Sequence, residues 1–170
     1  MKHIIASLLF LITTTVFADP APFGLEIGKA TVADAEKMYS IEKIGINEFF
    51  NGTVYRVAVN QIDFEGLKEL RLVFNKKGAL SIVHATLPKS QFKSIHHSLS
   101  KKYKVVKQEI PFVGDSFVQY VNGSTKILLN APHLSFDMTM QYFNKEMFAA
   151  IDAKLKEDAT AKKKSQEDRL

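Results

Sequence analysis

Apolar residues recur at helical spacing in three segments of the chain. A repeat of three and four residues places such positions on one side of an amphipathic α-helix. The segments are 31–39, 90–102 and the stretch that begins at Asn144. Their apolar positions are Val32, Ala35 and Met38 in the first, Phe92, Ile95 and Leu99 in the second, and Met147, Phe148, Ile151 and Leu155 in the third. The pattern predicts three helices.

Eight other runs alternate between apolar and polar residues, or are continuously apolar, over the length of a β-strand. Turn signals separate them, most clearly Asn51-Gly52 and Asn122-Gly123. The runs are 41–46, 53–59, 67–74, 79–87, 103–110, 116–121, 125–130 and 134–143. The last one alternates strictly, which is typical of an antiparallel sheet with one covered face and one wet face. Its covered face is predicted to hold Leu134, Phe136, Met138, Met140 and Tyr142.

The order of these elements is a helix and four strands, twice, and then a third helix. Two short sequence echoes accompany the order: KMYSIEKI at 37–44 with KKYKVVKQ at 101–108, and LVFNK at 72–76 with QYFNK at 141–145. We therefore expect an α+β fold built of two tandem α-β4 units, residues 22–87 and 88–145. Together they would form an antiparallel sheet with helices on one face, plus a C-terminal helix. The segment 154–170 is expected to be a charged, frayed tail.

The unit has a recognisable form. Gly28 and Thr31 precede a short helix, and four antiparallel strands follow. In this the chain resembles the repeat of the beta-lactamase inhibitor protein family and the related SmpA/OmlA family of small envelope lipoproteins, over residues 22–145. In the inhibitor family the unit occurs in tandem and its concave sheet clasps a partner protein. The resemblance therefore implies a role in binding a partner.

The chain also departs from both families. It contains no cysteine, so it lacks the lipid-carrying cysteine of the envelope lipoproteins and the cysteine pairs of the secreted inhibitor. Its second helix begins at Leu87-Pro88-Lys89-Ser90, without the glycine. For these reasons the resemblance transfers no partner-binding residue to this chain.

The first 18 residues have the layout of a signal peptide. Lys2 is followed by an apolar stretch, residues 4–12, and then by Val16 and Ala18 at the spacing of a small-residue cleavage site. A spanning helix would need about 20 apolar residues, so no membrane span is expected. We predict cleavage between Ala18 and Asp19, which leaves residues 19–153 as a single exported domain in the periplasm or outside the cell.

The charged residues and the histidines argue against binding of nucleic acid, nucleotide or metal. The 23 basic and 18 acidic residues are mixed along the chain, so we expect no nucleic-acid partner. Gly28-Lys29 does not continue a phosphate loop, because Phe23 stands where that loop needs its first glycine. The histidines have no metal-site spacing, and the neighbouring pair on the second helix points about 100° apart. They are His3, His84, His96, His97 and His133. No cofactor, metal site or catalytic residue is predicted.

Aromatic residues at two predicted hairpin tips are the remaining candidates. Phe49 and Phe50 precede the Asn51-Gly52 turn, and Phe112 precedes Gly114-Asp115. Apolar side chains on loops are a common contact surface, although they can also fold back over the core. The candidate partner-binding residues are Phe49, Phe50, Phe112 and Asp115.

These features favour an exported, non-enzymatic protein-binding module of the bacterial envelope. Its partner would be a protein or another envelope component, and it would act either as an inhibitor or as an assembly adaptor. Two alternatives stay open. One is a carrier of a lipid or small ligand, because a curved sheet beneath a helix can enclose a pocket. The other is a small periplasmic hydrolase that uses His84 or His133.

Overall fold

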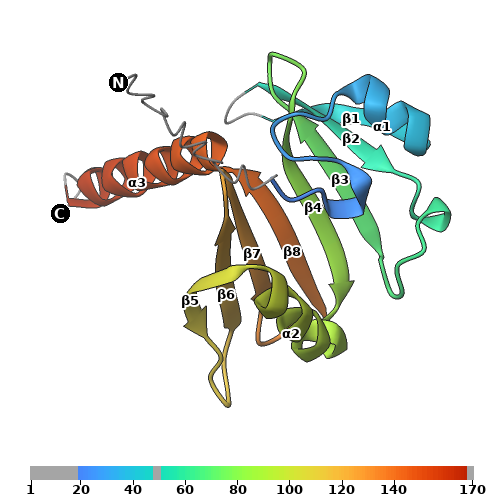
Figure 1. Ribbon diagram of the computed structural model, residues 1–170. Coiled ribbons are helices and arrows are strands. Elements are labelled where there is room, and N and C mark those ends of the chain that lie inside the picture. The colour runs from blue at the N-terminus through green and yellow to red at the C-terminus, as the bar shows by residue number, and fades with distance from the viewer. Residues whose placement is uncertain (1–18, 48–50, 168–170) are drawn as a thin grey trace, which may run out of the picture.

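The computed structural model describes residues 19–47 and 51–167 (Figure 1). In this part of the chain an eight-stranded antiparallel sheet is combined with three α-helices, so the predicted α+β class, the sheet and the C-terminal helix are confirmed. The first elements are α1 (Val32–Met38), β1 (Ile41–Asn47), β2 (Gly52–Val57), β3 (Glu69–Phe74) and β4 (Leu80–Pro88). They are followed by α2 (Phe92–Lys102), β5 (Lys104–Glu109), β6 (Ser116–Asn122), β7 (Thr125–Ala131), β8 (Asp137–Asn144) and α3 (Lys145–Glu167). Three short 3-10 turns are η1 (Pro22–Gly24), η2 (Val59–Gln61) and η3 (Lys89–Gln91).

The strands lie in the order β1-β2-β3-β4-β8-β7-β6-β5. β4 and β8 pair at the centre, from Ile82 opposite Phe143 to Pro88 opposite Asp137. The two halves of the chain therefore meet at one seam in the middle of the sheet, and β1 and β5 are its edges. Each edge strand carries a shift of register, between Lys43 and Gly45 in β1 and between Val105 and Lys107 in β5. Bulges of this kind twist an edge and discourage pairing with another strand.

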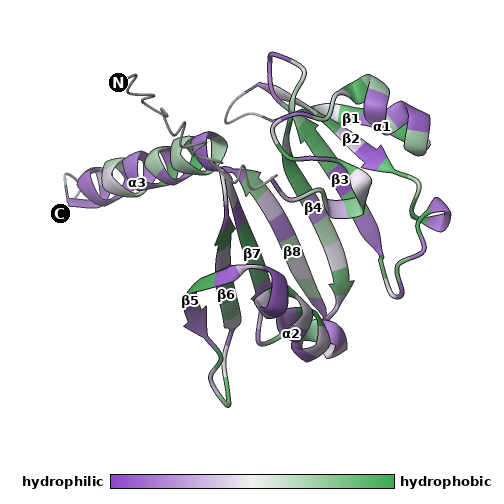
Figure 2. Cartoon of the chain, viewed as in Figure 1, coloured by the Kyte–Doolittle hydropathy of each residue, from purple (hydrophilic) through white to green (hydrophobic). Residues whose placement is uncertain are grey.

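The main core lies between the sheet and the helices α1 and α2. Hydrophobic and hydrophilic residues are interspersed along the strands (Figure 2), and the larger set of buried apolar side chains faces these helices. Ala35 of α1 and Phe92 and Leu99 of α2 are buried against them. β8 contributes Met138, Met140 and Tyr142 to this core, as its alternation predicts.

The beginning of the last strand was predicted wrongly. β8 starts at Asp137, and Leu134 and Phe136 are almost fully exposed in the loop before it. The chain reverses direction here after Pro132, and the turn is closed by hydrogen bonds from the Ser135 N–H to the Pro132 carbonyl (3.3 Å) and from the Asp137 N–H to Ser135 Oγ (3.0 Å). Apolar and polar residues thus go on alternating through this turn, although its residues belong to no strand and the alternation does not place them on a face of the sheet.

The helix α3 packs on the opposite face of the sheet from α1 and α2, which differs from the predicted single covered face. Its Met147, Phe148 and Ile151 lie against a small core of Val73, Ile82 and Phe143. The cause is the parity of β8: Tyr142 faces the main core, so Phe143 faces the other way, and α3 begins at Lys145. Lys126 Nζ lies 3.9 Å from the centre of the Phe148 ring and adds a cation–π contact.

The outer part of α3 continues to Glu167, where the sequence predicts a frayed tail from Lys154. All its side chains from Ala153 to Glu167 are exposed. Ion pairs one turn apart run along it, Lys156 with Asp152 (2.7 Å), Lys154 with Asp158 (3.4 Å) and Lys163 with Glu167 (3.8 Å). Such pairs favour a helix by a few tenths of a kcal/mol each, about 0.2–0.5.

Local signals before α1 act as the sequence indicates. Gly28 has a positive φ of 84°, and its N–H donates to the Leu80 carbonyl at 2.7 Å. Thr31 caps the helix: its Oγ1 accepts from the Asp34 N–H (3.3 Å), while the Asp34 carboxylate accepts from the Thr31 N–H (3.0 Å). This capping box lowers the pKa of Asp34, chiefly through the bond from the Thr31 hydroxyl.

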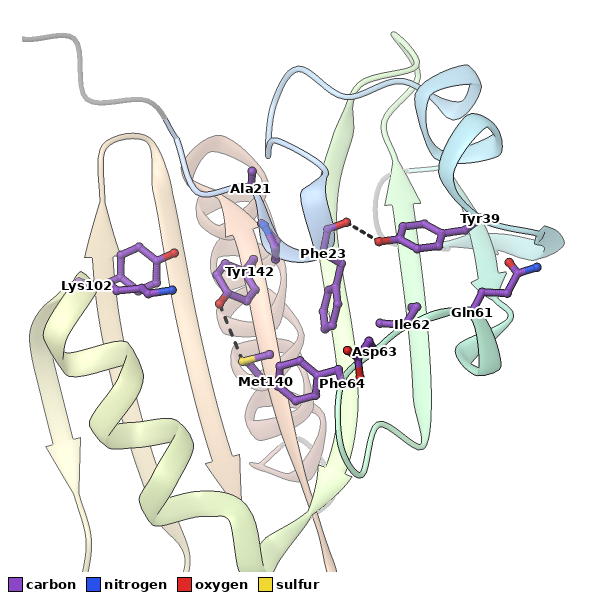
Figure 3. A pocket seen from close by; sticks show the side chains of 12 residues that line it. Ala21, Phe23, Tyr39, Gln61, Ile62, Asp63, Phe64, Lys102, Met140 and Tyr142 are labelled. Carbon is purple, nitrogen blue, oxygen red and sulfur yellow. Dashed lines mark hydrogen bonds between the residues drawn. The ribbon is translucent and has the colours of Figure 1, made fainter.

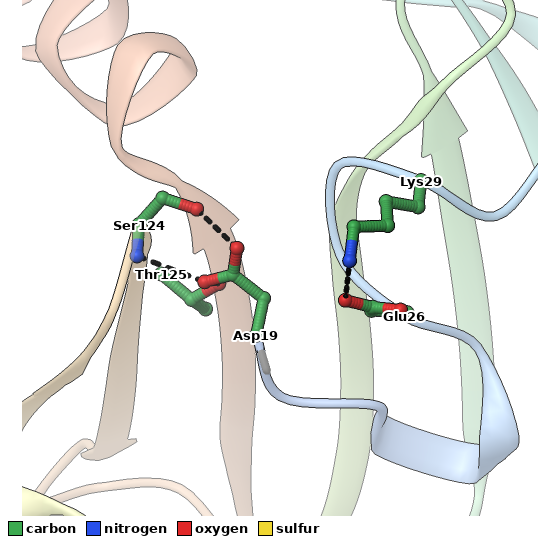
Figure 4. Close-up of polar contacts among 5 residues, drawn as sticks. All are labelled: Asp19, Glu26, Lys29, Ser124 and Thr125. Atoms are coloured by element: carbon green, nitrogen blue, oxygen red, sulfur yellow. Dashed lines mark hydrogen bonds and ion pairs between the residues drawn. The ribbon is translucent and has the colours of Figure 1, made fainter. Parts of the chain in front are cut away.

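An N-terminal segment connects the two halves (Figure 4). At one end the Asp19 carboxylate accepts hydrogen bonds from the Ser124 N–H (2.8 Å), the Ser124 hydroxyl (2.5 Å) and the Thr125 hydroxyl (3.2 Å), in the turn between β6 and β7. At the other end Gly28 is bonded to β4. Between them Leu25 and Ile27 are buried in the main core. Across the described ranges, no helix is both long and apolar enough to cross a membrane.

Candidate functional site

The predicted partner-binding residues divide into two groups. Phe112 and Asp115 lie in the loop between β5 and β6, while Phe49 and Phe50 lie outside the described residues. The Phe112 side chain is fully exposed and does not fold back over the core. The question is therefore what surrounds Phe112, and whether that surrounding forms a surface.

Phe112 is one member of an exposed apolar cluster, which we call the apolar loop end. It is formed by the β5–β6 loop (110–115) and the β7–β8 loop (132–136). The exposed fractions of its large side chains are 42% for Ile110, 106% for Phe112, 66% for Val113, 94% for Leu134 and 92% for Phe136. These five are half of the ten large hydrophobic residues that are exposed in the described chain, and they come from two short loops. Scattered exposed apolar residues are ordinary, whereas a gathering of this kind marks a contact surface.

Hydrogen bonds fasten these two loops to each other. Asp115 Oδ1 accepts from the His133 N–H at 2.6 Å, and the Gly114 N–H donates to His133 Nδ1 at 3.3 Å. Lys89, in η3, joins the same network, since its ammonium donates to the carbonyls of Pro132 (2.5 Å) and His133 (3.0 Å). Asp115 and His133 thus hold the framework, and the apolar side chains project from it.

A groove runs behind Phe112 towards α2. It has a volume of about 980 Å³ and is lined by Phe92, Lys93 and His96 of the helix and by Ile110, Pro111 and Phe112 of the loop. On its floor side His96 Nδ1 lies 2.6 Å from the Tyr120 hydroxyl. Burial raises the pKa of Tyr120 to about 12, partly offset by a hydrogen bond with Ser100. The phenol therefore stays neutral. Tyr120 belongs to the main core, while His96 is half-buried and lines the groove.

A second cavity lies over the central seam, away from the apolar loop end (Figure 3). It has two adjoining lobes of about 420 and 250 Å³, which share Phe64, Lys102, Tyr103, Met140 and Tyr142 in their linings. The larger lobe extends beneath the N-terminal segment, where Figure 3 shows the Phe23 ring pointing into the space with Met140 and Tyr142 on one side and Ile62 on the other. The smaller lobe extends along α2 to Ser94, Ile95, Ser98 and Leu99.

The two histidines considered for the hydrolase alternative, His84 and His133, are not brought together. His84 is on β4 on the α3 side, where its Nδ1 lies 2.8 Å from Gln141 Nε2, and His133 is in the apolar loop end. Burial lowers the pKa of His84, and the nearby charge of Arg71 lowers it further. Within residues 19–47 and 51–167, no three His, Cys, Asp or Glu side chains are grouped so that they could hold a metal ion.

Sequence reasoning missed Leu134 and Phe136 as surface residues because their alternation with polar residues reads as strand. Two signals could have found them. Pro132 is unsuited to the middle of a sheet, and Ser135 two residues before Asp137 is a local turn pattern. Comparison with protein-family models, with curated proteins and with solved structures finds no match to this chain.

Proposed function

We propose that this chain is an exported, non-enzymatic module that binds a partner protein through the apolar loop end. The observation that carries the proposal is the set of exposed side chains there, above all Phe112, Leu134 and Phe136. Leaving such large apolar side chains in water is unfavourable, and burying one against a partner contributes roughly 1.5–3 kcal/mol. A chain gains nothing from this exposure when it is alone.

The framework of the two loops favours binding over chance exposure. Ordering a loop at the moment of binding costs affinity, at about 0.5–1.5 kcal/mol for each immobilised side chain. Here the bonds among Asp115, His133 and Lys89 order both loops beforehand. The groove beside Phe112 gives the same surface a concave part, into which a partner's side chain can fit. Aromatic anchors beside a groove are typical of binding hot spots.

We further propose that the two halves are copies of one α-β4 unit. The support is the order of elements, which is a helix and four strands on each side of η3, and the sheet order, which reads outward from the seam as β4 to β1 and as β8 to β5. Tyr39 and Tyr103 also correspond: each follows its helix in extended conformation and donates its backbone N–H four residues back, to Ala35 and Leu99. A tandem unit of this kind agrees with the resemblance to the beta-lactamase inhibitor protein and to the SmpA/OmlA envelope lipoproteins.

Export remains part of the proposal. The contacts of Asp19 are made by its side chain, so cleavage between Ala18 and Asp19 would leave them intact. In the exported form the module would either block an enzyme of the envelope or help to assemble an envelope complex. These two forms differ in their consequence for the partner, because an inhibitor abolishes the partner's activity and an adaptor does not.

The test is capture of a partner from an envelope extract with surface variants that leave the core untouched. Replacing Phe112, Leu134 and Phe136 by Ser should abolish capture, because one truncated anchor can cost about 2 kcal/mol, or roughly thirtyfold in affinity. The melting temperature should stay close to that of the wild type. The intact mass of protein purified from the cell's own envelope should lack residues 1–18.

Matched controls make this test selective. Replacing Met38, Ile46 and Leu155 by Ser removes three exposed apolar side chains elsewhere and should leave capture unchanged. Replacing Phe49 and Phe50 by Ser examines the other predicted hairpin tip. His84→Gln should also capture normally, whereas the hydrolase alternative expects it to fail. Equal losses in the loop variant and in the surface control would refute the apolar loop end as the binding site.

A further inference from the structure

The cavity over the central seam is formed by parts of the chain that come from both halves. Its floor is Met140 and Tyr142 of β8, one wall is the last turn of α2, and the other is the N-terminal segment with Phe23 and the loop residue Phe64. Volumes of about 420 and 250 Å³ for its two lobes are of the size that small-molecule sites have, roughly 300–1,000 Å³. It is independent of the apolar loop end.

Most of the lining is apolar or aromatic, but it contains buried hydrogen-bond donors. Tyr142 is only 5% exposed, and its hydroxyl donates to the sulfur of Met140 at 3.8 Å. The Tyr142 hydroxyl also shares a hydrogen bond with the Tyr103 hydroxyl. A thioether is a weak acceptor, so an oxygen that entered the cavity would be a better partner than the Met140 sulfur. Burial raises the pKa of Tyr142 and of Tyr103, and the two rings meet edge to face with centres 6.5 Å apart. Both phenols therefore keep their protons at neutral pH and can donate.

One cation stands beside these donors. Of the residues that line the smaller lobe, Lys102 alone is charged, and no ion pair joins it to a carboxylate in the described chain. The hydroxyls of Ser94 and Ser98 in the same lobe already donate to helix carbonyls, at 2.9 and 3.0 Å. A lysine and two phenols at one end of an apolar space make a receptor for a single anionic group.

We infer that this cavity binds a small amphiphilic carboxylate, whose anionic group lies among Lys102, Tyr103 and Tyr142 and whose apolar chain or ring lies against Phe23, Phe64 and Leu99. The carboxylate satisfies the cation and gives the two phenols an oxygen acceptor. The apolar part fills the space between the two halves. Asp63 and Lys102 both line the larger lobe, whereas Lys102 is the one charged residue that lines the smaller lobe, so we place the anionic group in the smaller lobe.

The conformation of Phe23 agrees with a binding role. Its φ is 53°, in the left-handed region that bulky residues rarely adopt, and such strain is kept mostly at functional positions. Its carbonyl accepts from the Tyr39 hydroxyl at 2.8 Å, and its ring meets Phe64 with centres 5.6 Å apart. The strained residue thus presents its ring to the cavity, where it can pack on the apolar part of a ligand.

The chain carries its own reporter for this site. It has five tyrosines and no tryptophan, and three of the five, Tyr39, Tyr103 and Tyr142, line the cavity. Titration with sodium decanoate, below the concentration at which it forms micelles, should change the tyrosine fluorescence and saturate at one ligand per chain. Calorimetry should give the same affinity. Decanol, with the same chain length and no charge, should bind at least about tenfold more weakly.

Two variants with matched controls locate the site. Lys102→Gln should reduce decanoate affinity about tenfold, to that of decanol, while Lys101→Gln, a neighbouring lysine outside the lining, should not. Ser98→Trp should fill the smaller lobe and prevent binding of both probes, while the exposed His97→Trp should not. The inference is wrong if decanoate fails to saturate, if decanol binds the wild type equally well, or if Lys102→Gln and Lys101→Gln have the same affinity. Lys102→Gln changes only a surface charge, so it keeps the test valid if Ser98→Trp does not fold.

Discussion

The β3–β4 and β7–β8 hairpins each contribute one strand to the central seam of the sheet, and their turns differ in the polarity of their exposed side chains. The β3–β4 hairpin turns through Asn75, two lysines and Gly78, and none of the described residues of this turn is an exposed large hydrophobic one. Asn75 Oδ1 accepts from the N–H groups of Lys77 and Ala79, both at 3.0 Å, and Gly78 takes a positive φ of 79°. The Asn75 side chain and the conformation of Gly78 therefore both stabilise the reversal of the chain in this turn.

The β7–β8 hairpin also reverses the chain, but its turn contains apolar side chains that do not stabilise the turn. Its backbone is held by Ser135 and, from outside, by Lys89 and Asp115. The Phe136 carbonyl accepts from the Lys89 N–H at 2.8 Å, but the side chains of Leu134 and Phe136 are exposed to water. The contrast shows that strand pairing does not require a hydrophobic tip. The apolar residues of the second hairpin therefore need an explanation outside the folding of the sheet, which is why we assign them to a partner.

The largest expected effect is a difference in stability between substitutions at two residues of the same alternating run, Met138 and Phe136. Met138→Ala should destabilise the fold by about 2–5 kcal/mol, because Met138 is fully buried in the main core. Phe136→Ala should change stability by less than about 0.5 kcal/mol, because its ring is exposed. Urea denaturation of both variants measures the difference. A loss of more than about 2 kcal/mol in Phe136→Ala would place that ring in a packed site and remove the contrast between the hairpins.

A smaller effect should follow from removing the acceptor that joins the two loops. Asp115→Ala leaves the His133 N–H without its partner and should cost about 1 kcal/mol of stability. It should also speed hydrogen exchange at Gly114 and His133 while the turn at Asn75 is unaffected. Asp115→Asn keeps an acceptor oxygen and serves as the control. If exchange in the loops is the same in the Ala and Asn variants, the side chain of Asp115 does not order them.

The sequence predicted best those features that depend on residues close together in the chain. Strand and helix periods are local, and so is the capping box of Thr31 and Asp34, which forms as its spacing indicates. The face of the sheet on which α3 packs could also have been predicted, because Tyr142 and Phe143 point to opposite faces and the helix begins two residues later. It was missed because the strict alternation of the last strand was interpreted as one covered face and one wet face.

Other features depend on contacts that no local pattern encodes. The pairing of β4 with β8 brings together residues that are far apart in the sequence, such as His84 and Gln141 with a separation of 57. The cavity gathers Phe23, Phe64, Lys102 and Tyr142 from four segments, and none of them stands out in the sequence. For the apolar loop end the sequence predicted Phe112, while Leu134 and Phe136 were hidden in a strand-like alternation.

The smallest expected effect concerns pH and the seam where the two hairpins meet. His84 of β4 contacts Gln141 of β8 there, and burial lowers the pKa of His84 below its ordinary value of about 6.5. Between the folded and unfolded pKa values the unfolded chain binds more protons, so stability should fall as pH drops below about 6.5 and level off under the folded pKa. The effect should be modest, because His84 is only partly buried. Urea midpoints measured from pH 7.5 to pH 5 should show this fall in the wild type and in His97→Gln, and a flatter profile in His84→Gln. Parallel profiles for all three proteins would mean that the seam does not sense protonation of His84.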